Sequence, residues 1–176
     1  MIVCVGRRCW YWRPVYGCRV TDAVVTTVDA GTRKVARRVL VHAPAAAVFA
    51  LVADPRRHPD LDGSGTVRDS AVAAPDRLSV GAKFTVGMRA YGVPYKITST
   101  VTAYDDDRLV EWQHPLGHRW RWELAEVEPG VTEVTETFDY TTARSPLFLE
   151  LFGYPKINGE GIAKTLRGLA ARFDET

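Results

Sequence analysis

A long run of short strands between two helix-forming stretches is the feature that most limits what this chain can fold into. From about residue 64 to residue 140, apolar and polar residues alternate, and short turns rich in Pro, Gly or Asp separate the alternating segments. Turns this short join antiparallel neighbours, because a parallel pair needs a crossover of a dozen residues or more. The middle of the chain therefore predicts one antiparallel sheet.

The alternation also gives the bounds of each strand. A first β-branched segment lies upstream of the run, and six more follow within it. The expected strands are Val35–His42, Thr66–Val72, Lys83–Tyr91, Tyr95–Tyr104, Arg108–His114, His118–Val127 and Val131–Tyr140.

Helix signals flank this predicted sheet. Pro44 suits a helix start, Ala45–Ala53 places its apolar residues on one stripe, and Asp54-Pro55 begins a second, short helix. After Pro146 the period becomes helical again, and the last apolar stripe recurs at spacings of four, three and four: Ile162, Leu166, Leu169 and Phe173. Three glycines in this closing stretch disfavour a helix, so it needs tertiary support.

Length and composition indicate one ordinary globular domain. The chain has 176 residues, of which 46% are hydrophobic and 25% charged, and no apolar run reaches the eighteen residues of a membrane span. Beyond residue 34 there are 17 basic and 19 acidic residues. A body without excess positive charge is not expected to bind nucleic acid, and no transmembrane segment is expected.

Residues 1–34 are expected to be a disordered extension or an upstream stretch from too early a start codon. They mix Arg with Trp and Tyr without helical or alternating periodicity, and the alternative is an arm that binds a membrane surface or nucleic acid. All three cysteines, Cys4, Cys9 and Cys18, fall here without a CxxC pair. This argues against disulfides and structural zinc and favours a cytoplasmic location.

The order strand, two helices, six strands and helix carries a family resemblance, together with the segments VFALVADPRRHPDLDGSGTVRD and NGEGIAKTLRGLAARF. It resembles the START-related SRPBCC superfamily, most closely the polyketide cyclase/dehydrase and lipid transport branch, over about Val35 to Phe173. Asp54-Pro55 after the first helix is typical of that branch, whereas Asp60-Leu61 stands where a Trp is usual.

The resemblance implies an α+β helix-grip fold for residues 35–176. In that fold a curved antiparallel sheet of about seven strands wraps around a long C-terminal helix, and a ligand cavity lies between them. Members of the superfamily include carriers, hormone sensors, aromatases and cyclases, so the fold alone does not give the chemistry.

Strand parity assigns the side chains that would line such a cavity. Trp112, Trp120 and Trp122 lie on adjacent strands, where their rings can cluster around a ring-containing ligand. Core packing is the simpler interpretation of any single Trp, and the cluster is assigned to the lining because the resemblance supplies a cavity. The predicted ligand-binding residues are Phe84, Val86, Met88, Tyr95, Ile97, Val110, Trp112, Trp120, Trp122, Phe138, Tyr140, Ile162 and Leu166.

The candidate catalytic residues are Glu136, His114 and Tyr140. Parity points Glu136 inward among apolar residues, where its pKa would rise, although pairing with Arg89 or Arg121 is the alternative. His114 can approach His118 across a hairpin, but nothing nearby supplies a third metal ligand. No metal and no cofactor are expected, because motifs such as GxSxG, HExxH and the Rossmann fingerprint do not occur.

The sequence therefore favours binding or transport of a small hydrophobic ligand, such as a lipid, a polyketide or an aromatic metabolite. An enzyme of the polyketide cyclase, aromatase or dehydratase kind is the first alternative. A protein-interaction or stress-module component is the second. The sequence identifies neither the ligand nor the oligomeric state.

Overall fold

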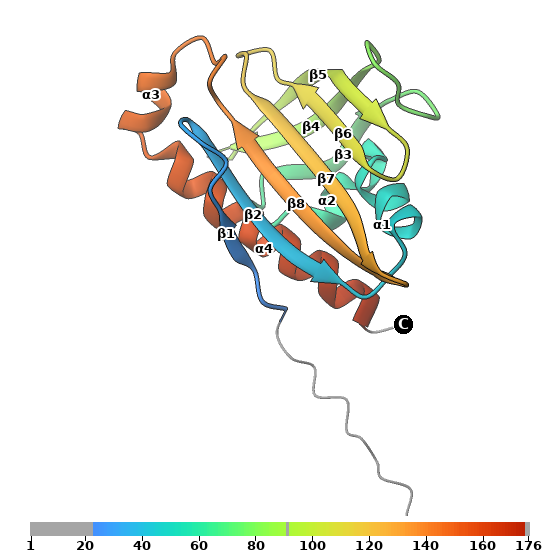
Figure 1. Cartoon of the computed structure of the whole chain (residues 1–176). Helices are drawn as coiled ribbons and strands as arrows, with labels where there is room; N and C mark the ends of the chain where they lie inside the picture. Colours follow the sequence, from blue (N-terminus) through green and yellow to red (C-terminus); the bar gives the residue numbers. More distant parts are fainter. Residues whose placement is uncertain (1–22, 91, 175–176) are drawn as a thin grey trace, which may run out of the picture.

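The computed structural model, drawn in Figure 1, describes residues 23–90 and 92–174. Their strands form one antiparallel sheet of eight, in the order β1-β2-β8-β7-β6-β5-β4-β3. The strands are β1 (Thr26–Val28), β2 (Lys34–Val41), β3 (Val67–Ala73), β4 (Lys83–Ala90), β5 (Val93–Asp105), β6 (Leu109–Gln113), β7 (Arg119–Glu128) and β8 (Val131–Asp139). Together with the helices they make the expected α+β helix-grip fold.

Seven of these strands match the segments expected from alternation, and each of their bounds lies within two residues of the expected position. The eighth, β1, falls in the stretch expected to lie outside the domain. It pairs Thr26–Val28 with Ala36–Arg38 of β2 through a turn in which Gly31 and Arg33 have positive φ. Alternation cannot be recognised over three residues, which is why the sequence does not predict β1. Because β1 pairs with β2, the domain begins before Val35. Residues 1–22 lie outside the described part, and so do the three cysteines on which the expected cytoplasmic location depends.

The helices are α1 (Ala45–Val52), the 3-10 turn η1 (Pro55–Arg57), α2 (His58–Leu61), α3 (Pro146–Leu151) and α4 (Tyr154–Asp174). Asp54 begins η1 because its carboxylate accepts a hydrogen bond from the backbone N–H of Arg56 at 3.0 Å. The apolar stripe of α1 is buried as expected. Among the described residues, no helix combines the length and apolarity needed to cross a membrane.

Helix α4 is the grip of the fold, and Figure 1 shows it running along one side of the sheet. It packs mainly on β2 and β8, and its stripe residues Ile162, Leu166 and Leu169 are fully buried. The loop after α2 also approaches it closely, since the Gly63 N–H donates to Thr165 Oγ1 at 2.9 Å. A Cβ on Gly63 would overlap the backbone nitrogen of Thr165. This close packing is the tertiary support that the glycine-containing helix needs.

The sheet curves toward α4, and we call the concave side of strands β2 and β4–β8 the inner face. A register shift in β5 between Val101 and Ala103, opposite β6, turns Tyr104 back to this face. Tyr104 then packs edge-on against Phe49 of α1, with ring centroids 5.5 Å apart. Bends of this kind let helices α1, α2 and α4 cover one side of a sheet.

Candidate functional site

Aromatic side chains from neighbouring strands meet on the inner face, as their parity predicts. Trp112 of β6 pairs with Trp120 of β7, and Trp120 pairs with Phe138 of β8. The ring centroids of Trp120 and Phe138 are 5.0 Å apart, and those of Trp112 and Phe84 are 5.7 Å apart. The inner face therefore carries two aromatic contacts, Phe84 with Trp112 and Trp120 with Phe138, whose tryptophans are partners in register.

Most of the predicted lining residues are part of the packed core in this conformation. Met88, Ile97 and Trp120 are half-buried, and Tyr95 is 40% exposed. The remaining nine are buried: Phe84, Val86, Val110, Trp112, Trp122, Phe138, Tyr140, Ile162 and Leu166. The accessible part of the inner face is thus its end near the β4–β5 hairpin.

This open end exists because α4 covers only part of the sheet. The helix packs on β2 and β8 and makes no comparable contact with β4, β5 or β6. At its first turn, Tyr154 lies near Tyr95 of β5, and burial together with Tyr154 raises the pKa of Tyr95. We define the open end by Met88, Tyr95, Ile97, Trp120 and Tyr154. The side chains of this open end are half-buried or exposed, in contrast to the other predicted lining residues, which are buried.

Glu136 is a carboxyl group buried on the inner face. Its side chain is 6% exposed, and Oε2 has no hydrogen-bond partner among the described residues. Burial, and secondly the charge of Asp62, raises the pKa of Glu136 well above its ordinary value. Arg121 does not neutralise it, because Arg121 faces outward and pairs with Glu111 and Glu123. Burial therefore favours the neutral, proton-donating form of Glu136.

His114 and His118 form a stacked pair at the end of the β6–β7 hairpin. Their ring centroids are 4.1 Å apart, and the Leu116 N–H donates to His114 Nδ1 at 3.1 Å. Burial, and secondly His114, lowers the pKa of His118 to about 4. His118 Nδ1 is buried without a hydrogen-bond partner in the described structure. Both imidazoles are consequently neutral near pH 7.

The candidate catalytic side chains lie near one another without direct hydrogen bonds. Phe138 contacts both His118 and Tyr140, at ring distances of 5.3 and 5.4 Å. Within residues 23–90 and 92–174, no hydrogen bond joins the side chains of any two of Glu136, His114, His118 and Tyr140, although the backbone N–H of His114 donates to the His118 carbonyl oxygen at 2.8 Å. The inner face therefore offers separate proton donors and acceptors, and no preassembled acid–base pair.

Two polar residues were missed at the sequence level. The ring of His58 stacks on Trp112 at 5.1 Å, and its Nε2 lies 3.2 Å from the Val52 carbonyl oxygen. Glu111 is buried on the outer face, where Thr102 donates to it at 2.7 Å and Arg121 at 3.4 Å. Both positions depend on contacts between distant segments, for which local pattern gives no signal.

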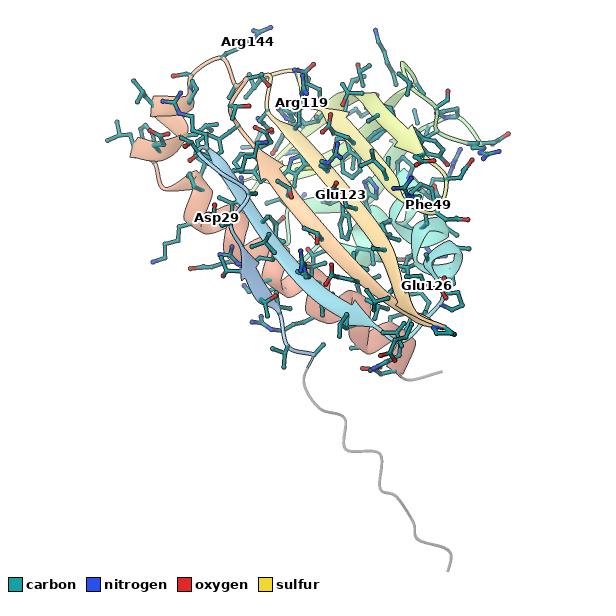
Figure 2. All side chains as sticks on the ribbon, viewed as in Figure 1. Asp29, Phe49, Arg119, Glu123, Glu126 and Arg144 are labelled. Carbon is teal, nitrogen blue, oxygen red and sulfur yellow. The ribbon has the colours of Figure 1, made fainter. Side chains whose placement is uncertain are left out.

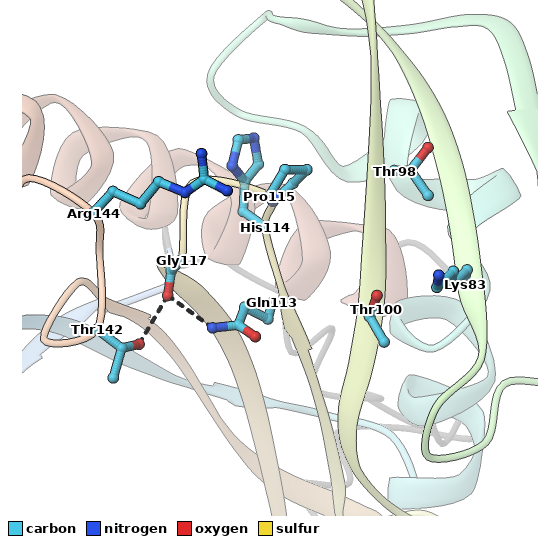
Figure 3. Close-up of a pocket in the computed structure, with 9 residues that line it drawn as sticks. All are labelled: Lys83, Thr98, Thr100, Gln113, His114, Pro115, Gly117, Thr142 and Arg144. Atoms are coloured by element: carbon cyan, nitrogen blue, oxygen red, sulfur yellow. Dashed lines mark hydrogen bonds between the residues drawn. The ribbon is translucent and has the colours of Figure 1, made fainter.

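The two best-formed hollows among the described residues do not lie between the inner face and α4. One, of about 500 Å³, is at the end of the sheet near the β6–β7 hairpin and includes Lys83, Thr100, Gln113 and Arg144 (Figure 3). The other, of about 510 Å³, is on the outer face among Arg38, Arg121, Glu123 and other residues. Charged and polar side chains contribute a large part of both linings, which does not suit a purely apolar ligand.

The expected hollow interior is therefore filled at the α1–α2 end. His58, Phe84 and Trp112 contact one another there, with His58 stacked on Trp112 and Phe84 edge-on to both. In the described part of the chain, no three His, Cys, Asp or Glu side chains come close enough to hold a metal ion. The open end remains as the accessible part of the inner face.

Comparison with known proteins finds a matching family and a similar sequence. Residues 32–174 match a family described as polyketide cyclase / dehydrase and lipid transport. An uncharacterized protein of Mycobacterium tuberculosis, Rv0088, is 53% identical over 153 residues, which are 85% of this chain and 68% of that protein.

Solved structures agree on the architecture. A protein from Arthrobacter aurescens aligns with a TM-score of 0.64 at 16% identity, covering 86% of this chain and 93% of that one. A START superfamily protein from Mycobacterium smegmatis aligns with a TM-score of 0.57 at 16% identity, covering 79% and 97%. At these identities the solved structures show the fold alone, whereas the family match covers most of the sequence. The chain therefore belongs to the polyketide cyclase / dehydrase and lipid transport family.

Proposed function

We propose that this protein binds a small, apolar, ring-containing molecule on the inner face, entering at the open end. The observation that supports the proposal most is the combination found there. Half-buried apolar side chains share the inner face with two buried polar atoms, Glu136 Oε2 and His118 Nδ1, which have no hydrogen-bond partner in the described structure. Buried polar atoms are nearly always satisfied, so a bound molecule or water is expected to complete them.

Affinity would come chiefly from apolar burial. At roughly 25 cal/mol per Å² of apolar area removed from water, a ligand burying about 200 Å² gains about 5 kcal/mol before the cost of immobilisation. Trp120, Ile97 and Met88 would supply this contact at the open end, and the neutral Glu136 carboxyl would donate to a carbonyl or hydroxyl oxygen. A ligand with one or more rings and one oxygen acceptor fits this arrangement.

Binding is tested with a matched pair of neighbouring residues on β5. Ile97 faces inward and Thr98 faces outward, so Ile97→Ala should weaken binding of the fluorescent probe N-phenylnaphthylamine about tenfold, whereas Thr98→Ala should leave it unchanged. Equal effects of the two substitutions, or no binding by the unsubstituted protein, would contradict the proposal.

An enzyme of the cyclase or dehydratase kind is a second candidate, because a carboxyl group kept neutral by burial can act as a general acid. Incubation with a linear poly-β-keto thioester, followed by mass spectrometry, tests it through the loss of water that dehydrative cyclisation requires. Activity should appear and be lost in Glu136→Gln. If the probe returns unchanged, only the binding function remains.

A further inference from the structure

An exposed apolar surface lies at the end of the molecule where α3 joins α4. It consists of Leu147, Phe148, Leu151, Phe152, Tyr154 and Ile157, which are 70, 51, 82, 57, 39 and 57% exposed. We call these six residues the apolar tip. The rings of Phe148 and Phe152 are 4.4 Å apart, so their side chains form one patch. Clustered exposure of this kind marks an interaction surface, whereas scattered apolar residues do not.

Local sequence explains why the tip stays out of the core. Pro146 begins α3, and Gly153 ends the segment with a φ of 70°. The six-residue helix has no buried side chain and packs on α4 alone among the elements with substantial contact. Figure 1 shows α3 projecting beyond the end of the sheet. The tip is therefore convex and narrow.

The charges around the tip are positive once ion pairs are counted. Between residues 144 and 157 the charged residues are Arg144, Glu150 and Lys156. Glu150 is neutralised by Arg33, whose Nε lies 3.1 Å from Glu150 Oε1. No carboxylate of the described residues lies within ion-pair distance of Arg144 or Lys156. Figure 2 shows Arg144 extending into solvent on the loop that leads to α3.

A convex apolar tip with a basic rim fits a lipid surface better than a second copy of this chain. A stable protein interface uses roughly 20–30 residues on each side, which six protruding side chains do not provide. Two copies meeting tip to tip would also bring their unpaired cations together. In an anionic bilayer, by contrast, the apolar side chains reach the acyl boundary while Arg144 and Lys156 meet lipid phosphates.

We propose that the apolar tip docks this protein on the surface of an anionic membrane. Tyr154 belongs both to the tip and to the open end of the inner face, so docking brings that opening to the bilayer. The proposal depends only on the exposed tip and its charges, and it holds whether or not the inner face binds a ligand.

Vesicle flotation of the full chain tests docking. The protein should float with vesicles of phosphatidylcholine mixed with phosphatidylglycerol, should float less with phosphatidylcholine alone, and should be released as salt concentration rises. Phe148→Ser combined with Leu151→Ser should reduce binding at least tenfold, since two apolar anchors are lost. Arg144→Gln combined with Lys156→Gln should abolish the preference for anionic vesicles.

Val127→Ser provides the matched control, because Val127 is 51% exposed and lies at the C-terminal end of β7, away from α3. It should leave flotation unchanged, and unaltered thermal unfolding should show that every variant is folded. Absence of flotation, or undiminished flotation of the double serine variant, would overturn the proposal. So would a dimer in solution that Leu151→Ser converts to monomer, because the tip would then be a contact between copies.

Discussion

Two side chains, Glu136 and His118, give the inner face its chemical character. Glu136 is buried and His118 half-buried on a face that is otherwise mostly apolar, and each has a buried polar atom without a partner in the described structure. Because burial disfavours charge, Glu136 holds a proton more tightly than usual and His118 more weakly. The pKa of Glu136 is raised and that of His118 is lowered, so a change of pH alters the stability contributed by the two groups in opposite directions.

Glu136→Gln should stabilise the unliganded protein increasingly as pH rises. Burial holds the folded-state pKa of Glu136 above its ordinary value of 4.5. The stability that protonated Glu136 contributes to the fold is therefore complete below pH 4.5 and is lost as pH rises through the folded-state pKa. Glutamine cannot ionise and avoids this loss. Urea unfolding should show a gain on the order of 1 kcal/mol at pH 7 and almost none at pH 4. A loss of stability at pH 7 would mean that an ionised Glu136 has a favourable partner.

Protonation of His118 should cost stability as the solution is acidified from pH 6.5 toward pH 4, in opposition to the contribution of Glu136. The folded-state pKa of His118, about 4, is below its ordinary value of 6.5, so the unfolded chain binds the proton more readily in this interval. His118→Gln should remove at most roughly 3 kcal/mol of the stability change between these two pH values. Burial also lowers the pKa values of His58 and His114, which therefore act in the same direction as His118. Equal slopes for the variant and the unsubstituted protein would contradict the assignment.

How much of the site the sequence predicts depends on the origin of each contact. Strand parity places Trp112, Trp120 and Glu136 on one face, because a two-residue period is a local property. His58 joins them only through the path of the loop between α1 and β3, which local pattern does not specify. Whether a residue that parity assigns to the inner face fills the core or faces an opening depends on where α4 lies. Trp112 and Trp122, for example, are predicted to line a cavity but are buried in the core.

At the level of elements, packing of α4 determines the shape of the inner face. The helix reaches β2 through Gly159, where a Cβ would lie 3.0 Å from side-chain atoms of Val35 and Arg37. It reaches the loop after α2 through Gly161 and Thr165, against Gly63. Sequence analysis predicts that this helix needs tertiary support, but not which glycines provide it. Gly168, in contrast, has open space around its Cβ position.

Two glycine substitutions should therefore have opposite effects. Gly63→Ala forces its Cβ into the backbone of α4 and should cost roughly 2–4 kcal/mol, because backbone atoms cannot yield as a flexible side chain can. Gly168→Ala should gain about 0.5–1 kcal/mol from higher helix propensity. Thermal unfolding of both variants under the same conditions measures this. A tolerated Gly63→Ala would show that the loop and α4 are farther apart than described here.

The short strand β1 gives a second test at this level. A chain beginning at Ala23 keeps β1, whereas a chain beginning at Lys34 loses it and leaves β2 as the edge of the sheet. The shorter chain should be less stable by roughly 1–2 kcal/mol and more prone to self-association, since β2 would present unpaired backbone groups. Equal stability and solubility of the two chains would mean that β1 adds nothing to the fold.

For the whole molecule, the alternating pattern and the flanking helices are sufficient to predict a helix-grip domain, and the family match agrees. The expected enclosed cavity is the part that the sequence does not settle, because it depends on how far side chains fill the space beneath a curved sheet. The structure instead has a filled end beside α1 and α2 and an accessible end near Tyr95 and Tyr154. The proposed ligand accordingly binds at the open end.

Methyl chemical-shift mapping by NMR tests this claim most directly. On titration with N-phenylnaphthylamine, the largest shifts are predicted for the inner-face methyl groups of Met88, Ile97 and Val86. Methyl groups of Thr98 and Thr100, which line the polar hollow beside Lys83, should remain in place. Shifts confined to those threonines or to the outer face, or none at saturating probe, would contradict the account.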